Sequence, residues 1–175
     1  MYMKKLSLVL LLIAAFANGC GDKTISATEY NNKIVGEQDK ITQTMLVVVE
    51  KINAGDYNAA LAGLEKSVQQ CDSSVIALTA MDPYEGDTQF RDAALALFKY
   101  YKKALNDDYR GLIGILIKTD GEVTEEDSLK IEAINKDIET QEAKYTKAVN
   151  DAQQAFCKKH NVTLAPNNLQ QAIDG

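Results

Sequence analysis

The spacing of apolar residues between positions 57 and 78 constrains the fold of this chain more than any other feature. These residues recur in alternating steps of four and three, as Tyr57, Leu61, Leu64, Val68, Cys71, Val75 and Leu78. Such spacing places them along one side of an α-helix, in the a and d positions of packed helices. Asp56 can cap this helix, and Asp82-Pro83 ends it. The segment therefore predicts a helix whose apolar side must be covered by other helices.

Three further segments show helical periodicity, over residues 26–55, 88–120 and 124–160. Ser26 with Glu29 has the spacing of a capping box, and Thr124 with Asp127 resembles a second one. The residues predicted to face the core of these segments are Tyr30, Ile34, Ile41, Met45, Val48, Ile52, Phe90, Ala94, Leu97, Tyr101, Leu105, Tyr109, Leu112, Leu116, Ile131, Ile134, Ile138, Tyr145, Val149, Ala152 and Phe156. No stretch alternates with a period of two over a convincing length, so strands are not expected.

Four long helices with short connections predict an all-α protein, built as an up-down-up-down four-helix bundle. After Pro166, the pair Leu169 and Ile173 predicts a short C-terminal helix that packs back on the bundle. Within the third segment, Gly111 and Gly114 are expected to mark close helix contact or a local bend. Because 46% of the 175 residues are apolar, a sizeable core can form, and residues 26–175 are expected to make one domain.

The first nineteen residues have the layout of a signal peptide that is removed from the mature protein. Lys4 and Lys5 precede an apolar run from Leu6 to Phe16, interrupted only by Ser7. Eleven residues at a rise of about 1.5 Å each cover only ~17 Å, roughly half of a ~30 Å hydrocarbon core. The run is therefore predicted to be the apolar region of a signal peptide and not a membrane span.

Small residues and a cysteine, Ala17-Asn18-Gly19-Cys20, end the apolar run. This pattern resembles the lipobox of bacterial lipoproteins, in which the cysteine is acylated through its sulfur and becomes the new N-terminus. The resemblance implies lipidation at Cys20, and two or more acyl chains hold a protein stably on a bilayer. Gly21 is not the aspartate that signals inner-membrane retention in such proteins, so the outer membrane is expected. The alternative is ordinary secretion after Gly19, with Cys20 as a free thiol or a disulfide partner.

The mature chain is expected to stand close to the membrane and to carry a negative surface. Residues 20–25 form the predicted lipidated tether, and five extended residues reach at most about 17 Å. Removing residues 1–19 takes away two lysines and no acidic residue, which changes the formal net charge from -6 to -8. Such a charge repels phosphate, so a nucleic-acid partner is not expected.

Two cysteines, Cys71 and Cys157, remain after Cys20 is assigned to lipid. An exported domain with two cysteines often joins them, so a disulfide is expected. In a square bundle, however, the second and fourth helices are diagonal, which separates their Cα atoms beyond the ~7 Å limit for a bridge. Two buried free thiols therefore remain the alternative.

Metal, haem and catalytic motifs find little support. Cys157-Lys158-Lys159-His160 lacks the second cysteine of a haem attachment site. Its basic side chains are instead expected at the C-terminus of a helix, where they oppose the negative end of the helix dipole. The single histidine of the chain also excludes a di-iron site of the ferritin type. The acidic residues before the fourth helix lack calcium-binding spacing and suit a helix N-terminus instead: Asp120, Glu122, Glu125, Glu126 and Asp127. No glycine-rich phosphate loop or Gly-x-Ser-x-Gly occurs, so no cofactor and no catalysis are expected.

Tyrosine is unusually frequent, with eight residues and no tryptophan. Tyr84 and Tyr100 lie outside the expected core stripe, and rings with a polar tip suit a partner or glycan surface. Half-buried edges of a bundle use such rings equally well, so packing at an edge is the alternative. A basic stripe that includes Lys99, Lys102, Lys103 and Arg110 is interrupted by acidic residues and is expected to be a solvated face.

Short motifs at 30–35, 86–87, 91–94 and 99–101 are similar to those of uncharacterised all-helical bacterial surface lipoproteins. These families carry no established activity, so the resemblance implies fold and location. The expected role is that of a lipid-anchored cell-envelope protein that is structural or binds another protein. The alternative is an envelope module that binds a small ligand or glycan in an inter-helical or tyrosine-lined groove.

Overall fold

The computed structural model describes residues 25–119 and 122–164, and this part of the chain is all-helical, as expected. Its helical segments are α1 (Ala27–Asn53), α2 (Tyr57–Thr79), α3 (Gln89–Ala104), the π-helix η1 (Leu105–Tyr109), α4 (Arg110–Lys118) and α5 (Glu125–Lys159). The predicted signal peptide, Cys20 and the short C-terminal helix lie outside the described residues. No helix in the described ranges is long and apolar enough to cross a bilayer.

The helix starts predicted from capping residues are confirmed. At α1, the Ser26 backbone N–H donates to Glu29 Oε2 (2.8 Å) and the Glu29 N–H donates to Ser26 Oγ (3.2 Å), which completes a capping box. Asp56 caps α2 by accepting from the Ala59 N–H, and Thr124 caps α5 by accepting from the Asp127 N–H. The sequence therefore fixes where three of the long helices begin.

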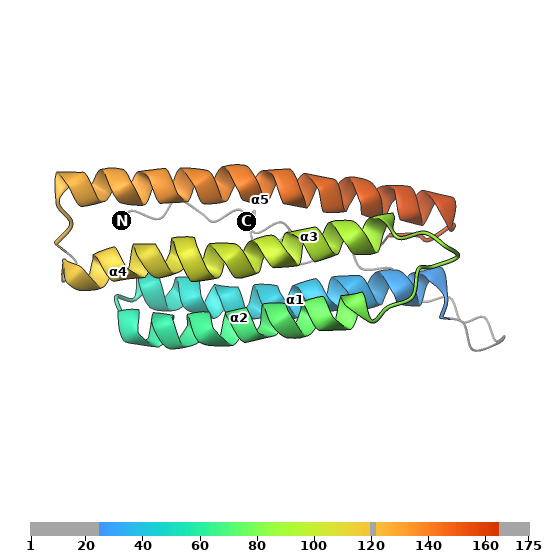
Figure 1. The fold of residues 1–175 in the computed structure, drawn as a ribbon, viewed down its shortest axis with the longest axis horizontal. Coiled ribbons are helices and arrows are strands. Elements are labelled where there is room, and N and C mark those ends of the chain that lie inside the picture. The colour runs from blue at the N-terminus through green and yellow to red at the C-terminus, as the bar shows by residue number, and fades with distance from the viewer. Residues whose placement is uncertain (1–24, 120–121, 165–175) are drawn as a thin grey trace.

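The third predicted helix is one rod that contains a π-helical turn. Here η1 separates α3 from α4 without a break in the chain direction (Figure 1). A π-turn absorbs one extra residue, which keeps Leu105, Tyr109 and Leu112 on the buried side of the rod. Of the two explanations expected for Gly111 and Gly114, close helix contact or a local bend, close contact is wrong, because a Cβ built on either would meet nothing within 4 Å.

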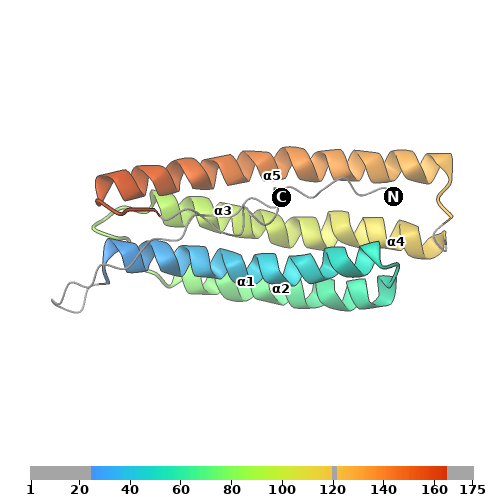
Figure 2. The same cartoon turned by 180° about the vertical axis from the view of Figure 1, so that it is seen from behind.

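The long helices lie side by side along most of their length (Figures 1 and 2). The most extensive packing joins α1 to α2, α3 to α5, and α2 to α3. In contrast, α1 and α5 touch at few places. Both views also show that α4 and the first part of α5 extend past the turn between α1 and α2.

The core follows the predicted apolar stripes only in part. On α2, the predicted residues Leu64, Cys71 and Leu78 are buried, but Tyr57, Leu61, Val68 and Val75 are only half-buried, and the small residues Ala60, Ser67 and Ser74 are buried as well. Ile34, Leu64, Leu97 and Val149 are all fully buried. The predicted core residues Leu116, Ile131, Ile134, Tyr145 and Ala152 are only half-buried. The first three of these belong to α4 and the N-terminal part of α5.

Candidate functional site

The expected disulfide between Cys71 and Cys157 is not formed, and both side chains are buried free thiols. Cys71 belongs to α2, whose main neighbours are α1 and α3, whereas Cys157 belongs to α5. The Cys157 Sγ lies 3.8 Å from Asn31 Oδ1 on α1 and does not face Cys71. Burial raises the pKa of the Cys71 thiol to about 12 and that of Cys157 to about 11. Both thiols are therefore protonated and poorly reactive at neutral pH.

Tyr84 and Tyr100 do not form a shared binding surface. Tyr100 is buried, its hydroxyl donates to the Ile138 carbonyl (3.1 Å), and its ring stacks on Tyr145. Tyr84 is half-buried and packs against Tyr30 and other rings at the opposite end of α3. The expectation that Tyr100 lies outside the core was wrong, because helix periodicity does not show that α5 covers the Tyr100 side of α3. The half-buried Tyr84 agrees with the alternative of an edge residue. The two residues that supported a tyrosine-lined groove are thus used in packing.

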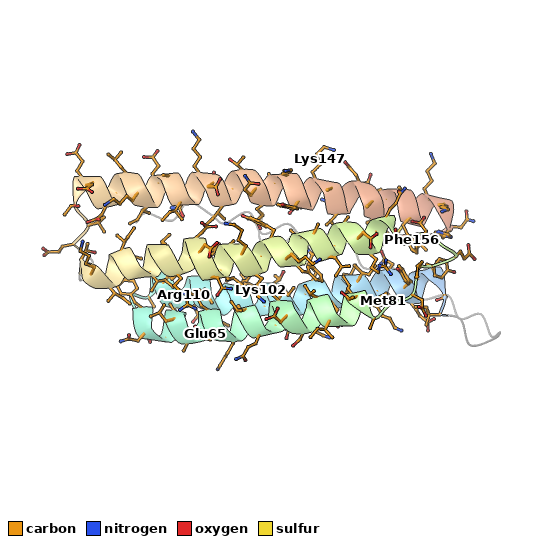
Figure 3. All side chains as sticks on the ribbon, viewed as in Figure 1. Glu65, Met81, Lys102, Arg110, Lys147 and Phe156 are labelled. Carbon is orange, nitrogen blue, oxygen red and sulfur yellow. The ribbon has the colours of Figure 1, made fainter. Side chains whose placement is uncertain are left out.

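An aromatic cluster closes one end of the helical body. Phe156 on α5 lies at its centre, with ring centroids 5.4 Å from Tyr30, 5.5 Å from Tyr84 and 5.8 Å from Phe90. Figure 3 shows Phe156 pointing from α5 toward the other helices. The His160 ring adds a face-to-edge contact with Tyr84 at 4.9 Å. The predicted basic helix C-terminus is confirmed, because α5 ends at Lys159 with Lys158 in its last turn and His160 as its C-cap. The His160 side chain is also packed, at only 6% exposed.

The turn before α3 is held against the end of α5 by charge. Tyr84 and Asp87 exchange backbone hydrogen bonds across Glu85 and Gly86, which both have positive φ values of 50° and 82°. The Asp87 carboxylate accepts from Lys159 Nζ at 2.8 Å and from the Gln89 N–H at 3.1 Å. The hydrogen bond from Lys159 is the main cause that lowers the pKa of Asp87. This ion pair joins the 84–87 turn to α5.

A buried polar layer lies between α5 and the α3–η1 rod, and sequence reasoning missed it. Glu142 on α5 is only 5% exposed, and the Tyr101 hydroxyl donates to its Oε1 in a long hydrogen bond of 3.5 Å. Tyr109 is 2% exposed, and its hydroxyl has no hydrogen-bond partner in the structure. Burial raises the pKa of Glu142 to about 7 and raises the pKa values of both tyrosines.

The sequence does contain a signal for this layer. In the fourth segment, the apolar stripe has a gap between Ile138 and Tyr145. Positions 141 and 142 lie on the same side of the helix as Ile138, but neither carries an apolar residue. Position 142 follows Ile138 by four residues, so Glu142 is the side chain that the helix directs inward. A carboxylate at an inward position is a stronger indication of a site than an exposed tyrosine.

Two residues of the predicted basic stripe, Lys102 and Arg110, pair with acidic residues of a neighbouring helix. Lys102 Nζ lies 2.6 Å from Asp72 Oδ1, and Arg110 Nη2 lies 2.5 Å from Glu65 Oε1. Figure 3 shows Lys102 and Arg110 on the side of the α3–α4 rod that faces α2. These partly exposed ion pairs contribute roughly 0–1 kcal/mol each and help to set how the rod lies on α2.

Over the described ranges, no group of three or more His, Cys, Asp or Glu side chains is arranged to hold a metal ion. Comparisons of the chain with protein-family models, with curated proteins and with solved structures find no match. The functional proposal therefore depends on the residues of this chain alone.

Proposed function

We propose that this protein is a lipid-anchored protein of the bacterial cell envelope, with a structural or protein-interaction role and no catalysis. Cys20 carries the anchor after removal of residues 1–19, and the outer membrane is the proposed location. Its partners are the membrane, through the acyl chains, and a second envelope protein. The observation that carries the proposal is the cysteine that follows a basic and then an apolar segment of signal-peptide length.

The start of α1 supports a body that lies close to the bilayer. The capping box at Ser26 ends the tether six residues after Cys20. An extended tether of this length spans roughly 20 Å at most, which is less than half of the ~52 Å that the 35 residues of α5 span. The anchored body then has little freedom to move away from the membrane.

The proposal includes an up-down-up-down order of the four rods. Short connections support this order, because only Ala54, Gly55 and Asp56 separate α1 from α2. Gly55 has a φ of +74°, which lets the chain reverse within this short turn. Neighbouring helices joined by so few residues pack antiparallel.

An interaction role is supported by apolar side chains that the helical body leaves exposed. Leu46 and Val47 are adjacent on α1 and are 48% and 46% exposed, while Ile76 on α2 is 69% exposed. Exposed apolar residues on a helix are a common means of contact with a partner helix.

Replacement of the predicted lipidation site tests the proposal. Cys20→Ala should abolish metabolic labelling with palmitate and should release the protein from the membrane fraction. Cys157→Ala is the matched control, because it removes a buried cysteine of the body and should leave labelling unchanged. Labelling of Cys20→Ala at the level of the wild type, or recovery of the wild type with an unmodified Cys20 thiol, would contradict the anchor.

A further inference from the structure

Glu142 occupies a position that a carboxylate rarely takes. It lies on the inward side of α5, four residues after the buried Ile138 and seven before the buried Val149. Its side chain is 5% exposed, so almost no water is available to solvate a negative charge. A buried charge is normally compensated by an opposite charge or by several hydrogen bonds.

Among the residues that the structure describes, no cation compensates Glu142. Within residues 25–119 and 122–164, no lysine, arginine or histidine forms an ion pair with its carboxyl group. Its hydrogen-bond partner on α3 is the Tyr101 hydroxyl, at the limit of hydrogen-bond length. The other titratable groups that interact with it are acids or phenols: Glu139 on α5, Tyr100 on α3 and Tyr109 on η1. The titratable groups that the described ranges bring to Glu142 are therefore all neutral or negative at neutral pH.

The helical rod opposite Glu142 is irregular at this level. Tyr109 ends the π-helix η1, and its buried hydroxyl has no partner. A π-turn interrupts the regular hydrogen bonds of a helix and is common at functional sites. The π-helix η1 thus supplies Tyr109, one of the phenols that lie near the Glu142 carboxyl group.

We propose that Glu142 is a proton-dependent switch that controls the packing of α5 against the α3–η1 rod. With its proton, the carboxyl group is neutral and fits the tyrosine layer. Loss of the proton to solvent leaves a negative charge beside phenols and Glu139, with no cation from the described helices to balance it. The α3–α5 interface is then weakened, and α5 becomes easier to separate from the rod.

The direction of the pH dependence follows from burial. Desolvation raises the pKa of Glu142 from 4.5 to about 7, while Tyr101 lowers it by a smaller amount. A carboxyl group whose pKa is higher in the folded chain than in the unfolded chain stabilises the fold at acidic pH, below the unfolded value. That stability is lost as the pH rises from about 4.5 to about 7, and the loss is complete above the folded pKa. Between about pH 5 and pH 8, the unfolding constant should rise by on the order of 100-fold from this group.

The test measures the urea midpoint of the wild type and of Glu142→Gln from about pH 5 to pH 8. The wild type should lose stability as the pH rises, and Glu142→Gln should remove most of that loss. Glu132→Gln is the matched control, because it removes an exposed carboxylate from the same helix and should keep the pH dependence of the wild type. Equal pH dependence of the wild type and Glu142→Gln would overturn the proposal.

A second measurement on the wild type covers the case in which Glu142→Gln does not fold. Carbon-13 NMR of the side-chain carboxyl groups should show one glutamate that titrates near pH 7. This resonance is assigned to Glu142 through its contacts with Tyr101. Amide hydrogen exchange, corrected for the intrinsic pH effect, should be faster around residues 138–149 above that transition than below it. Titration of every glutamate near pH 4, or protection of α5 that does not change with pH, would overturn the proposal.

Discussion

Gln153 on α5 donates a hydrogen bond from its Nε2 to Oδ1 of Asn31 on α1, across 2.8 Å and a separation of 122 residues in the chain. Asn31 is fully buried and Gln153 is 2% exposed. The Cys157 thiol approaches the same oxygen at 3.8 Å. Because α1 and α5 touch at few places, this buried amide pair is a main connection between the first and last helices of the described chain.

Loss of the amide pair should weaken the fold. Asn31→Ala removes the acceptor of a buried donor and should destabilise the protein by about 1–3 kcal/mol. Asn58→Ala, at an exposed position of α2, is the control and should change stability by less than about 0.5 kcal/mol. Urea unfolding of Asn31→Ala, Gln153→Ala and the double variant measures the coupling between the two side chains. Additive effects of the two single changes would mean that the hydrogen bond contributes nothing of its own.

Much of the fold could be predicted from the sequence because it depends on local rules. The cap at Ser26 and the turn at Gly55 are set by residues within a few positions of each other. The inward positions of Ile34 and Leu64 follow from helical spacing. The π-turn at Leu105–Tyr109 was not predictable. It sets which residues of the α3–α4 rod face the neighbouring helices, and the sequence does not show which helices those are.

The glycines of the helices should respond differently to alanine. A Cβ on Gly63 of α2 would lie 3.1 Å from Val48 Cγ2 on α1, whereas a Cβ on Gly114 of α4 would meet nothing within 4 Å. Gly114→Ala should therefore stabilise the protein by about 0.5–1 kcal/mol through helix propensity alone. Gly63→Ala should gain less or lose stability, because Val48 must move. Thermal unfolding measures both, and Gly63→Ala as stabilising as Gly114→Ala would show that α1 and α2 separate easily.

The ion pair between Asp87 and Lys159 should stabilise the fold only above the acidic range. Lys159 lowers the pKa of Asp87 in the folded chain. The ion pair therefore contributes to folding stability above the unfolded pKa of about 4. It is lost as the pH falls through the folded value. Asp87→Asn should cost about 1 kcal/mol at neutral pH and nothing once Asp87 is protonated.

The matched control for this ion pair is Asp151→Asn. The pair of Asp151 with Lys147 is more exposed, with side chains 61% and 75% exposed, and should contribute less than about 0.5 kcal/mol. Urea midpoints near pH 7 and near pH 3 test both variants. A loss in Asp87→Asn that is equally large at the two pH values would show that the carboxylate charge is not its cause.

The candidate sites were harder to predict than the fold, because they depend on which helices become neighbours. Tyr100 was expected at the surface, but α5 covers it and the Ile138 carbonyl accepts from its hydroxyl. Glu142 looked like one of many charges on a polar helix, although the α3–η1 rod faces it. Periodicity gives the direction of a side chain on its own helix, and it does not say which rod lies opposite.

The two buried thiols should be unreactive in the folded protein and free of a disulfide. With Cys20 replaced by alanine, a thiol reagent should label Cys71 and Cys157 slowly at neutral pH, because burial raises the pKa values to about 12 and about 11. In urea, both should react quickly without a reductant. A reductant should also leave the unfolding midpoint unchanged, because there is no bridge to break. Reaction of both thiols in urea only after reduction would show that the two helices approach closely enough to be joined.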